Sequence, residues 1–145
     1  MGKVGTMGSD PLGGYDSGVF NVNSIAEAMR IILTPEGSTT ERRWAAETPY
    51  LADLVTRCLA PRSGGILLDY GCGIGRLAKE AIRRHGCRIA GADISPSMRA
   101  LAVPYIGSDL FFSCAPAMLD LLIERGLRFD GAISVWVLQH CEHPA

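Results

Sequence analysis

Three closely spaced glycines and an acid are the residues of this sequence best suited to holding a ligand. Asp69 is followed by Gly71, Gly73 and Gly75, and Cys72 lies between the first two glycines. Glycine has no Cβ, so it permits positive φ and lets a ligand approach the backbone closely. We therefore expect these five residues to form a ligand-binding turn.

The residues on either side of this turn predict the elements that position it. An apolar run at 66–68 indicates a buried strand, and the apolar spacing from Arg76 to His85 indicates a helix that Gly86 ends. A strand, a glycine turn and a helix form a cradle for nucleotide-like ligands in this order. The helix N-terminus adds unpaired N–H groups and a partial positive charge, which favour an anionic group.

A second acid, Asp93, ends the next predicted strand at 87–92, about twenty residues beyond the glycine turn. A carboxylate at this place can accept hydrogen bonds from ribose hydroxyls. The alternative is that Asp93 caps the following helix. Ser95 and Pro96 already supply a cap and a first turn for that helix, so the ribose role is favoured, with Ile94 beside it at the ligand.

Alternation of strands and helices continues to the end of the chain. We expect a short helix after Pro96, interrupted by Pro104 and Gly107, a third strand at 110–114, a helix from 116 to 126, and a fourth strand at 129–136. Short links between such elements are typical of an α/β protein with a doubly wound parallel sheet. About four strands are expected here.

The part of the chain before the sheet is predicted to be helical. Residues 1–23 are rich in glycine and are expected to form a flexible leader, or a flap that becomes ordered over a ligand. Residues 24–62 are expected to form a helical lid and residues 63–145 the ligand-binding core. Three helices are expected in this lid: residues 25–32 after the Ser24/Glu27 capping box, residues 40–47, and residues 49–59 after Thr48.

Aromatic residues and cysteines in this sequence are interpreted as structural. Trp44 and Tyr50 in the lid segment are expected to pack in the core. The five cysteines include no Cys-x-x-Cys pair, and most lie in apolar or glycine-rich runs where a buried thiol fits. No secretory signal is apparent, so we expect a reduced, cytoplasmic protein.

Composition excludes some classes of partner. The chain of 145 residues is long enough for one domain, with 48% hydrophobic and 20% charged residues. Its net charge of −1 and its scattered basic residues do not favour nucleic acid. The pairs at 42–43 and 83–84 are interpreted as solvated helix faces. No apolar run has the length of a membrane span.

Taken together, these motifs resemble those of the class I S-adenosylmethionine-dependent methyltransferases. The family's first motif is an acid followed by Gly-x-Gly-x-Gly after an apolar strand, which Asp69 and the three glycines match. A dinucleotide fingerprint would need a glycine where Arg76 stands, which disfavours a nicotinamide-dependent oxidoreductase. The resemblance covers residues 44–143 and implies a Rossmann-like fold, S-adenosylmethionine as cofactor, and the binding set Asp69, Gly71, Cys72, Gly73, Gly75, Asp93 and Ile94.

The same resemblance implies methyl transfer to an oxygen, nitrogen or carbon nucleophile, by default of a small molecule. The run Leu138-Gln139-His140 looks like the end of the family's fourth motif. His140 is therefore the candidate catalytic base, and its alternative role is to pack against the cofactor. A metal site at 140–143 is disfavoured because adjacent side chains cannot all converge on one ion.

Two departures from the family pattern affect these expectations. No carboxylate lies at 113–116, where the family often has an acid that contacts adenine. The chain also ends soon after the fourth strand, whereas the family's sheet continues through about three more strands. We therefore expect an incomplete domain whose fourth strand leaves an apolar edge open to self-association or to a partner chain. The alternative function is a non-catalytic module that binds a nucleoside or a partner.

Overall fold

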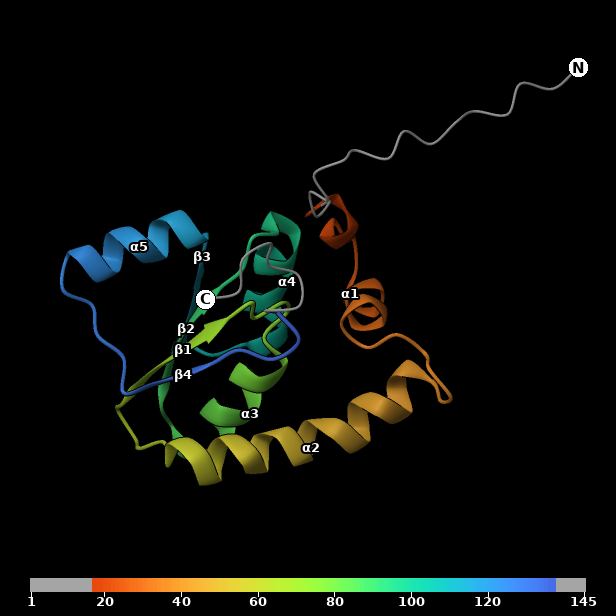
Figure 1. Cartoon of the computed structure of the whole chain (residues 1–145), viewed down its shortest axis with the longest axis horizontal. Coiled ribbons are helices and arrows are strands. Elements are labelled where there is room, and N and C mark those ends of the chain that lie inside the picture. Colours follow the sequence, from red (N-terminus) through yellow and green to blue (C-terminus); the bar gives the residue numbers. More distant parts are fainter. Residues whose placement is uncertain (1–16, 138–145) are drawn as a thin grey trace, which may run out of the picture.

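The computed structural model describes residues 17–137, which form a sheet with helices on both faces (Figure 1). Its strands are β1 (Ile66–Tyr70), β2 (Arg88–Ala92), β3 (Phe111–Cys114) and β4 (Gly131–Ile133). Its helices are the 3-10 turn η1 (Ser17–Phe20), α1 (Ile25–Ile32), α2 (Thr40–Leu59), α3 (Arg76–His85), α4 (Pro96–Ile106) and α5 (Pro116–Glu124). The predicted α/β class is confirmed.

The sheet is parallel and has the strand order β3-β2-β1-β4. Successive strands after β1 are added on one side as far as β3, and the chain then crosses to the other side of β1 to form β4. In an open parallel sheet, the point where the order reverses leaves a crevice beyond the carboxyl ends of the strands. That crevice lies here at the ends of β1 and its two neighbours.

The two faces of the sheet are covered unequally. Helices α2, α3 and α4 pack on one face, where apolar side chains from all four strands form the largest buried cluster, including Leu67, Ile89 and Phe111. On the opposite face lies α5, drawn in blue in Figure 1, whose Leu119 packs with Ala92 of β2 in a smaller cluster. The main core therefore lies between the sheet and α2–α4.

The lid segment differs from the prediction because α2 is one continuous helix. Two helices were expected on either side of Thr48-Pro49, but α2 runs unbroken from Thr40 to Leu59. The Thr48 hydroxyl donates to the Trp44 carbonyl at 2.5 Å within the helix instead of capping a new one. Packing of α2 along α3 outweighs the local proline signal. The expected core position of Tyr50 is wrong, because this side chain is 61% exposed.

Other local signals are confirmed with small differences. Ser24 caps α1 by accepting from the Glu27 amide at 3.2 Å, while the Glu27 carboxylate accepts from the Asn23 amide rather than from Ser24. The helix after the second strand is not interrupted by Pro104 and ends at Gly107, which has a positive φ of 63°. Strands β2 and β3 each begin one residue later than expected.

The fourth strand is much shorter than predicted. It spans only residues 131–133. Directly before it the Asp130 side chain accepts from the Ile66 amide at 2.8 Å, and three residues after its end Trp136 has a positive φ of 62°. Within the described residues β4 is an edge strand, but Ile133 is 4% exposed and lies in the main core. The apolar edge is thus smaller than expected.

None of the helices in residues 17–137 is long and apolar enough to cross a membrane.

Candidate ligand-binding site

A cavity of about 570 Å³ opens at the carboxyl ends of β1 and β2. Its floor is the glycine turn with Asp69 and Asp93, and its other sides come from α1 with the loop after it, the start of α2, and residues 135–137. This is the crevice that the strand order produces, and its volume suits a ligand of cofactor size.

The glycine turn is held by backbone hydrogen bonds to the end of β2. The amides of Gly71 and Cys72 donate to the Ala92 carbonyl at 2.7 and 3.1 Å. The Gly73 amide donates to the Asp93 carboxylate at 2.8 Å. These bonds fix the predicted turn beside the predicted second acid, so the structure brings the two sequence motifs into one site.

The three glycines of the turn occupy different surroundings. Gly71 and Gly73 line the cavity, and the nearest side chain to Gly73 is Ile32 of α1. Gly75 does not line it. This residue has φ of 80°, and a Cβ there would collide with Ile106 of α4. Gly75 therefore lets α3 start close to α4, which is a packing role.

Asp93 does not cap the helix that follows it. One carboxylate oxygen accepts from the Gly73 amide and the other from the Ser95 amide at 2.9 Å, while the Ser95 hydroxyl accepts from the Met98 amide and caps α4. Each carboxylate oxygen has a second lone pair for a ligand hydroxyl. Burial raises the pKa of Asp93, and the Ser95 and Gly73 amides oppose that rise.

Asp69 lies deeper in the floor and is 4% exposed. Burial, and secondly the negative charge of Asp93, raise the pKa of Asp69 to about 7. Burial also raises the pKa of the Cys72 thiol, with Asp69 and Asp93 adding to the effect. These surroundings therefore favour the neutral thiol of Cys72 over the thiolate.

Ile94 and His140 are the remaining residues predicted for the site. Ile94 lines the cavity and is 61% exposed. His140, the candidate base, and the possible metal ligands at 140–143 lie outside the described residues. Among residues 17–137 no group of three His, Cys, Asp or Glu side chains is placed to hold a metal ion.

Sequence reasoning missed the basic wall of the cavity, which Arg43 and Arg76 provide. Arg76 is only 5% exposed, its Nε donates to the Thr48 hydroxyl at 2.7 Å, and its guanidinium lies 4.8 Å from the centre of the Trp44 ring. Arg43 was expected on a solvated face, and that prediction is wrong. The available signal was an arginine directly after the third glycine, in the first turn of a helix.

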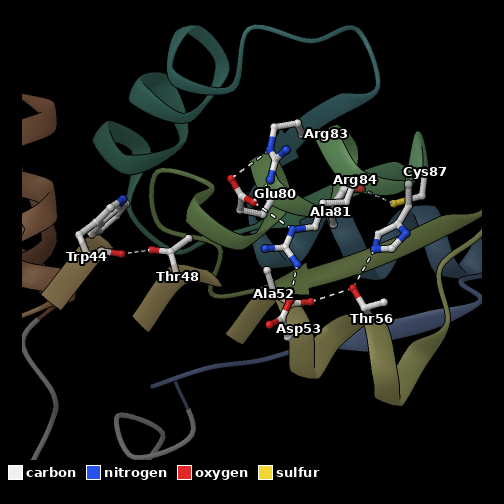
Figure 2. A network of polar contacts seen from close by, with 11 residues as sticks. Trp44, Thr48, Ala52, Asp53, Thr56, Glu80, Ala81, Arg83, Arg84 and Cys87 are labelled. Atoms are coloured by element: carbon white, nitrogen blue, oxygen red, sulfur yellow. Dashed lines mark hydrogen bonds and ion pairs between the residues drawn. The ribbon is translucent and has the colours of Figure 1, made fainter. Parts of the chain in front are cut away.

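A second polar network holds α2 against α3 (Figure 2). Arg84 of α3 contacts Asp53 of α2 at 2.6 Å and Glu80 of its own helix at 3.1 Å. The Thr56 hydroxyl lies 2.9 Å from His85 Nε2. None of these residues lines the cavity. The network lies between α3 and α2, the helix from which Arg43 projects.

Comparison with known proteins identifies the family. The methyltransferase domain family matches residues 42–145. A ubiquinone biosynthesis O-methyltransferase from Xylella fastidiosa is 31% identical over 103 residues, which are 69% of this chain and 41% of that protein. One from Alkalilimnicola ehrlichii is 32% identical over 102 residues, 67% of this chain and 40% of that protein. The match spans about two fifths of these relatives.

Solved structures give a weaker likeness. An RNA methyltransferase from Salinibacter ruber in complex with S-adenosyl-L-homocysteine is 26% identical, with a TM-score of 0.43, over 46% of this chain and 46% of that one. A likeness at this TM-score adds no argument about the site. The family match extends over the glycine turn, both floor acids and the strands that position them. On this evidence the chain belongs to the methyltransferase domain family, whose class I members take S-adenosylmethionine as their cofactor.

Proposed function

We propose that the chain is the cofactor-binding part of an S-adenosylmethionine-dependent methyltransferase that acts on a small molecule. The observation that carries the proposal is the hydrogen bond between the Gly73 amide and the Asp93 carboxylate. It joins the two cofactor motifs at the floor of one cavity of about 570 Å³, at the carboxyl ends of parallel strands.

The floor residues divide the binding of the cofactor among them. The free lone pairs of Asp93 accept the ribose hydroxyls, and exposed Ile94 offers an apolar contact to adenine. Gly71 and Gly73 let the methionine part of the cofactor approach the backbone. Asp69, when ionised, pairs with a positive group of that part. Cys72 fills the turn beneath.

Bound S-adenosylmethionine supplies a methyl group already activated by its positively charged sulfur. The chain's own residues then have to hold the acceptor in line with that methyl group and exclude water, which are proximity and electrostatic effects. His140 remains the proposed base for an acceptor that must lose a proton. An oxygen acceptor is favoured, because both curated relatives are named as O-methyltransferases.

The proposed organisation follows the motif positions. Residues 24–62 serve as a lid and residues 63–145 as the cofactor-binding core, with residues 1–23 as a leader. The edge of β4 is the proposed place for self-association or a partner chain, since β4 ends the sheet in the described part of the chain.

Titration calorimetry with S-adenosylhomocysteine tests the proposal. We expect micromolar binding by the 145-residue chain and at least about a tenfold loss in Asp93→Ala, because two hydrogen bonds to a charged acceptor disappear. Asp120→Ala on α5, an exposed residue that does not line the cavity, is the matched control and should bind like the parent. If circular dichroism shows that the chain is folded and the chain still does not bind S-adenosylhomocysteine, the proposal is refuted.

The alternative, a non-catalytic nucleoside-binding module, makes the same binding prediction. Transfer of a labelled methyl group from S-adenosylmethionine to a phenolic acceptor separates the two. Transfer that needs Asp93 supports the enzyme, whereas tight binding without transfer to any tested acceptor supports the module.

A further inference from the structure

Trp136 is an exposed aromatic residue at the edge of the cavity. It lines the cavity and is 55% exposed. Single exposed apolar side chains are common on protein surfaces, so exposure alone indicates no function. Tyr50 is such a case, because it is 61% exposed on the regular backbone of α2 and does not line the cavity. The backbone and the surroundings of Trp136 distinguish it from Tyr50.

The backbone of Trp136 has a conformation that few large residues adopt. Its φ is 62°, in the left-handed region, where the Cβ of an L-residue comes too close to the next carbonyl oxygen. Among residues 17–137 the only other residue besides glycine with a positive φ is Ala60, which is the C-cap of α2. Trp136 follows a strand and ends none of the described helices. Strain of this kind persists where the surroundings impose it, and it recurs at ligand-binding sites.

The two neighbouring valines hold the chain on either side of Trp136. Val135 packs against the main core. Val137 lies over the glycine turn, where a Cβ on Gly71 would collide with its side chain. Because both valines are held inward, the indole between them is left at the surface of the cavity.

The indole of Trp136 also has a free face. Among residues 17–137 no aromatic ring or cation stacks on it. The ring of Trp44, in contrast, has the Arg76 guanidinium 4.8 Å from its centre and the Tyr105 ring edge-on at 6.4 Å. An indole offers a large, flat, apolar surface with few rotatable bonds, so little conformational entropy is lost when another ring stacks on it.

The strand order separates Trp136 from the acid proposed for the ribose. Asp93 follows β2, the glycine turn follows β1, and Trp136 comes three residues after the end of β4, on the other side of β1 (Figure 1). Under the proposed function, a cofactor with its ribose at Asp93 and its methionine part at the glycine turn occupies the ends of β2 and β1. The end of the cavity beside β4 is then left for the acceptor. Residues 135–137, which line that end, carry no charge.

We propose that Trp136 binds the acceptor by stacking and thereby favours an acceptor with a flat, aromatic ring. The inference rests on the proposed function, and it narrows the substrate class from small molecules in general to planar aromatic ones. Stacking covers the exposed indole and fixes the plane of the acceptor ring, which reduces the freedom that the acceptor has to lose before reaction. Trp136 is therefore a residue that determines specificity.

Two probes that differ in flatness test the proposal without any mutation. Catechol and cis-1,2-cyclohexanediol have the same ring size and two adjacent hydroxyls, but only catechol is planar and aromatic. Each is titrated by ligand-observed NMR into the 145-residue chain saturated with S-adenosylhomocysteine. Stacking predicts that catechol binds roughly fivefold more tightly. Equal affinities for the two probes, or no binding of either, overturn the proposal.

Variants then assign the preference to the indole. Trp136→Leu keeps an apolar side chain without a ring, and it should lower the affinity for catechol roughly fivefold. Its affinities for cis-1,2-cyclohexanediol and for S-adenosylhomocysteine should stay within about twofold of the parent. Trp136→Phe keeps a smaller ring and should fall between Trp136→Leu and the parent. Tyr50→Leu removes an exposed aromatic ring outside the cavity, so this matched control should leave all three affinities unchanged.

The affinity for S-adenosylhomocysteine separates this inference from the proposed function. If the parent chain does not bind S-adenosylhomocysteine, the proposed function fails, and the inference that rests on it fails too. If the parent chain binds it but Trp136→Leu weakens all three ligands equally, the role of Trp136 is structural and the inference alone is overturned. A loss confined to S-adenosylhomocysteine places the indole against the cofactor and likewise overturns it. A loss confined to catechol supports the stacking of an aromatic acceptor.

Discussion

The floor of the cavity comes from two short stretches of chain, whereas its basic wall combines side chains from elements far apart in the sequence. The floor is fixed by backbone amides, as when Gly71 and Cys72 donate to Ala92. The wall is fixed by side-chain contacts of Arg76 with Thr48 and Trp44. Backbone-held parts depend on glycines at particular positions, and side-chain-held parts depend on how neighbouring helices pack. The following experiments test that difference.

The largest effect is expected at Gly75. Gly75→Ala should lower the free energy of unfolding by about 3 kcal/mol, because a Cβ at positive φ would also collide with Ile106. Gly64 is the matched control, since its φ is 77° but no atom lies within 4 Å of its Cβ position. Gly64→Ala should cost about 1 kcal/mol. Urea denaturation measures both variants. If Gly75→Ala and Gly64→Ala lose the same free energy of unfolding, the collision with Ile106 does not contribute.

The wall should be sensitive at Thr48. Thr48→Val removes the acceptor for Arg76 Nε from a residue that is 9% exposed, and should cost about 2 kcal/mol in the free energy of unfolding. Thr56 on the same helix contacts His85 in a half-buried place. Thr56→Val should cost less than about 1 kcal/mol. A neutral Thr48→Val variant would contradict the view that this contact holds the wall.

The floor should make ligand affinity depend on pH. Asp69 has a pKa of about 7 and faces the charges of Asp93 and the thiol of Cys72. Under the proposed function its ionised form pairs with the ligand's ammonium, so S-adenosylhomocysteine should bind about tenfold more tightly at pH 8 than at pH 6. Asp69→Asn should remove this dependence. If the affinity of the variant still changes with pH, another group is responsible for the dependence.

The same raised pKa has a consequence for stability. The folded chain without ligand holds the Asp69 proton more tightly than the unfolded chain, whose carboxyl titrates near its ordinary value of 3.8. Asp69 therefore lowers the free energy of unfolding as pH rises from about 4 to about 7. Urea unfolding of the parent and of Asp69→Asn across this range measures the contribution.

The smallest effect is expected in the outer network of Figure 2. Asp53 pairs with Arg84, but its side chain is 63% exposed and water screens the pair. Asp53→Ala should leave the thermal unfolding midpoint and the ligand affinity unchanged. A clear loss of affinity would mean that the α2–α3 contact, and not only the wall, controls the cavity.

Much of the fold and the floor could be predicted because the signals are local. The apolar run before Asp69, the glycine turn, and the cap at Ser95 each lie within a few residues, and each has its expected place in the structure. Helix α2 was mispredicted because tertiary packing overrides the proline at position 49. At the start of β4 the Asp130 side chain meets the Ile66 amide, a contact that no sequence pattern reveals.

The wall could not be predicted for the same physical reason. Arg43 belongs to a basic pair that has the pattern of a solvated face, and only the position of α2 beside the glycine turn brings it to the cavity. The burial of Arg76 depends on Trp44 and Thr48, about thirty residues earlier in the chain. Side chains that are brought together only by the packing of helices follow no fixed spacing in the sequence.

Both tryptophans of the sequence lie within reach of the cavity. Trp136 lines it and is 55% exposed, while Trp44 lies against the Arg76 guanidinium and the edge of Tyr105. A ligand that displaces water from Trp136 shifts its emission to shorter wavelength, and a change at Arg76 alters the quenching of Trp44. The unlabelled protein can therefore report occupancy of the cavity by its intrinsic fluorescence.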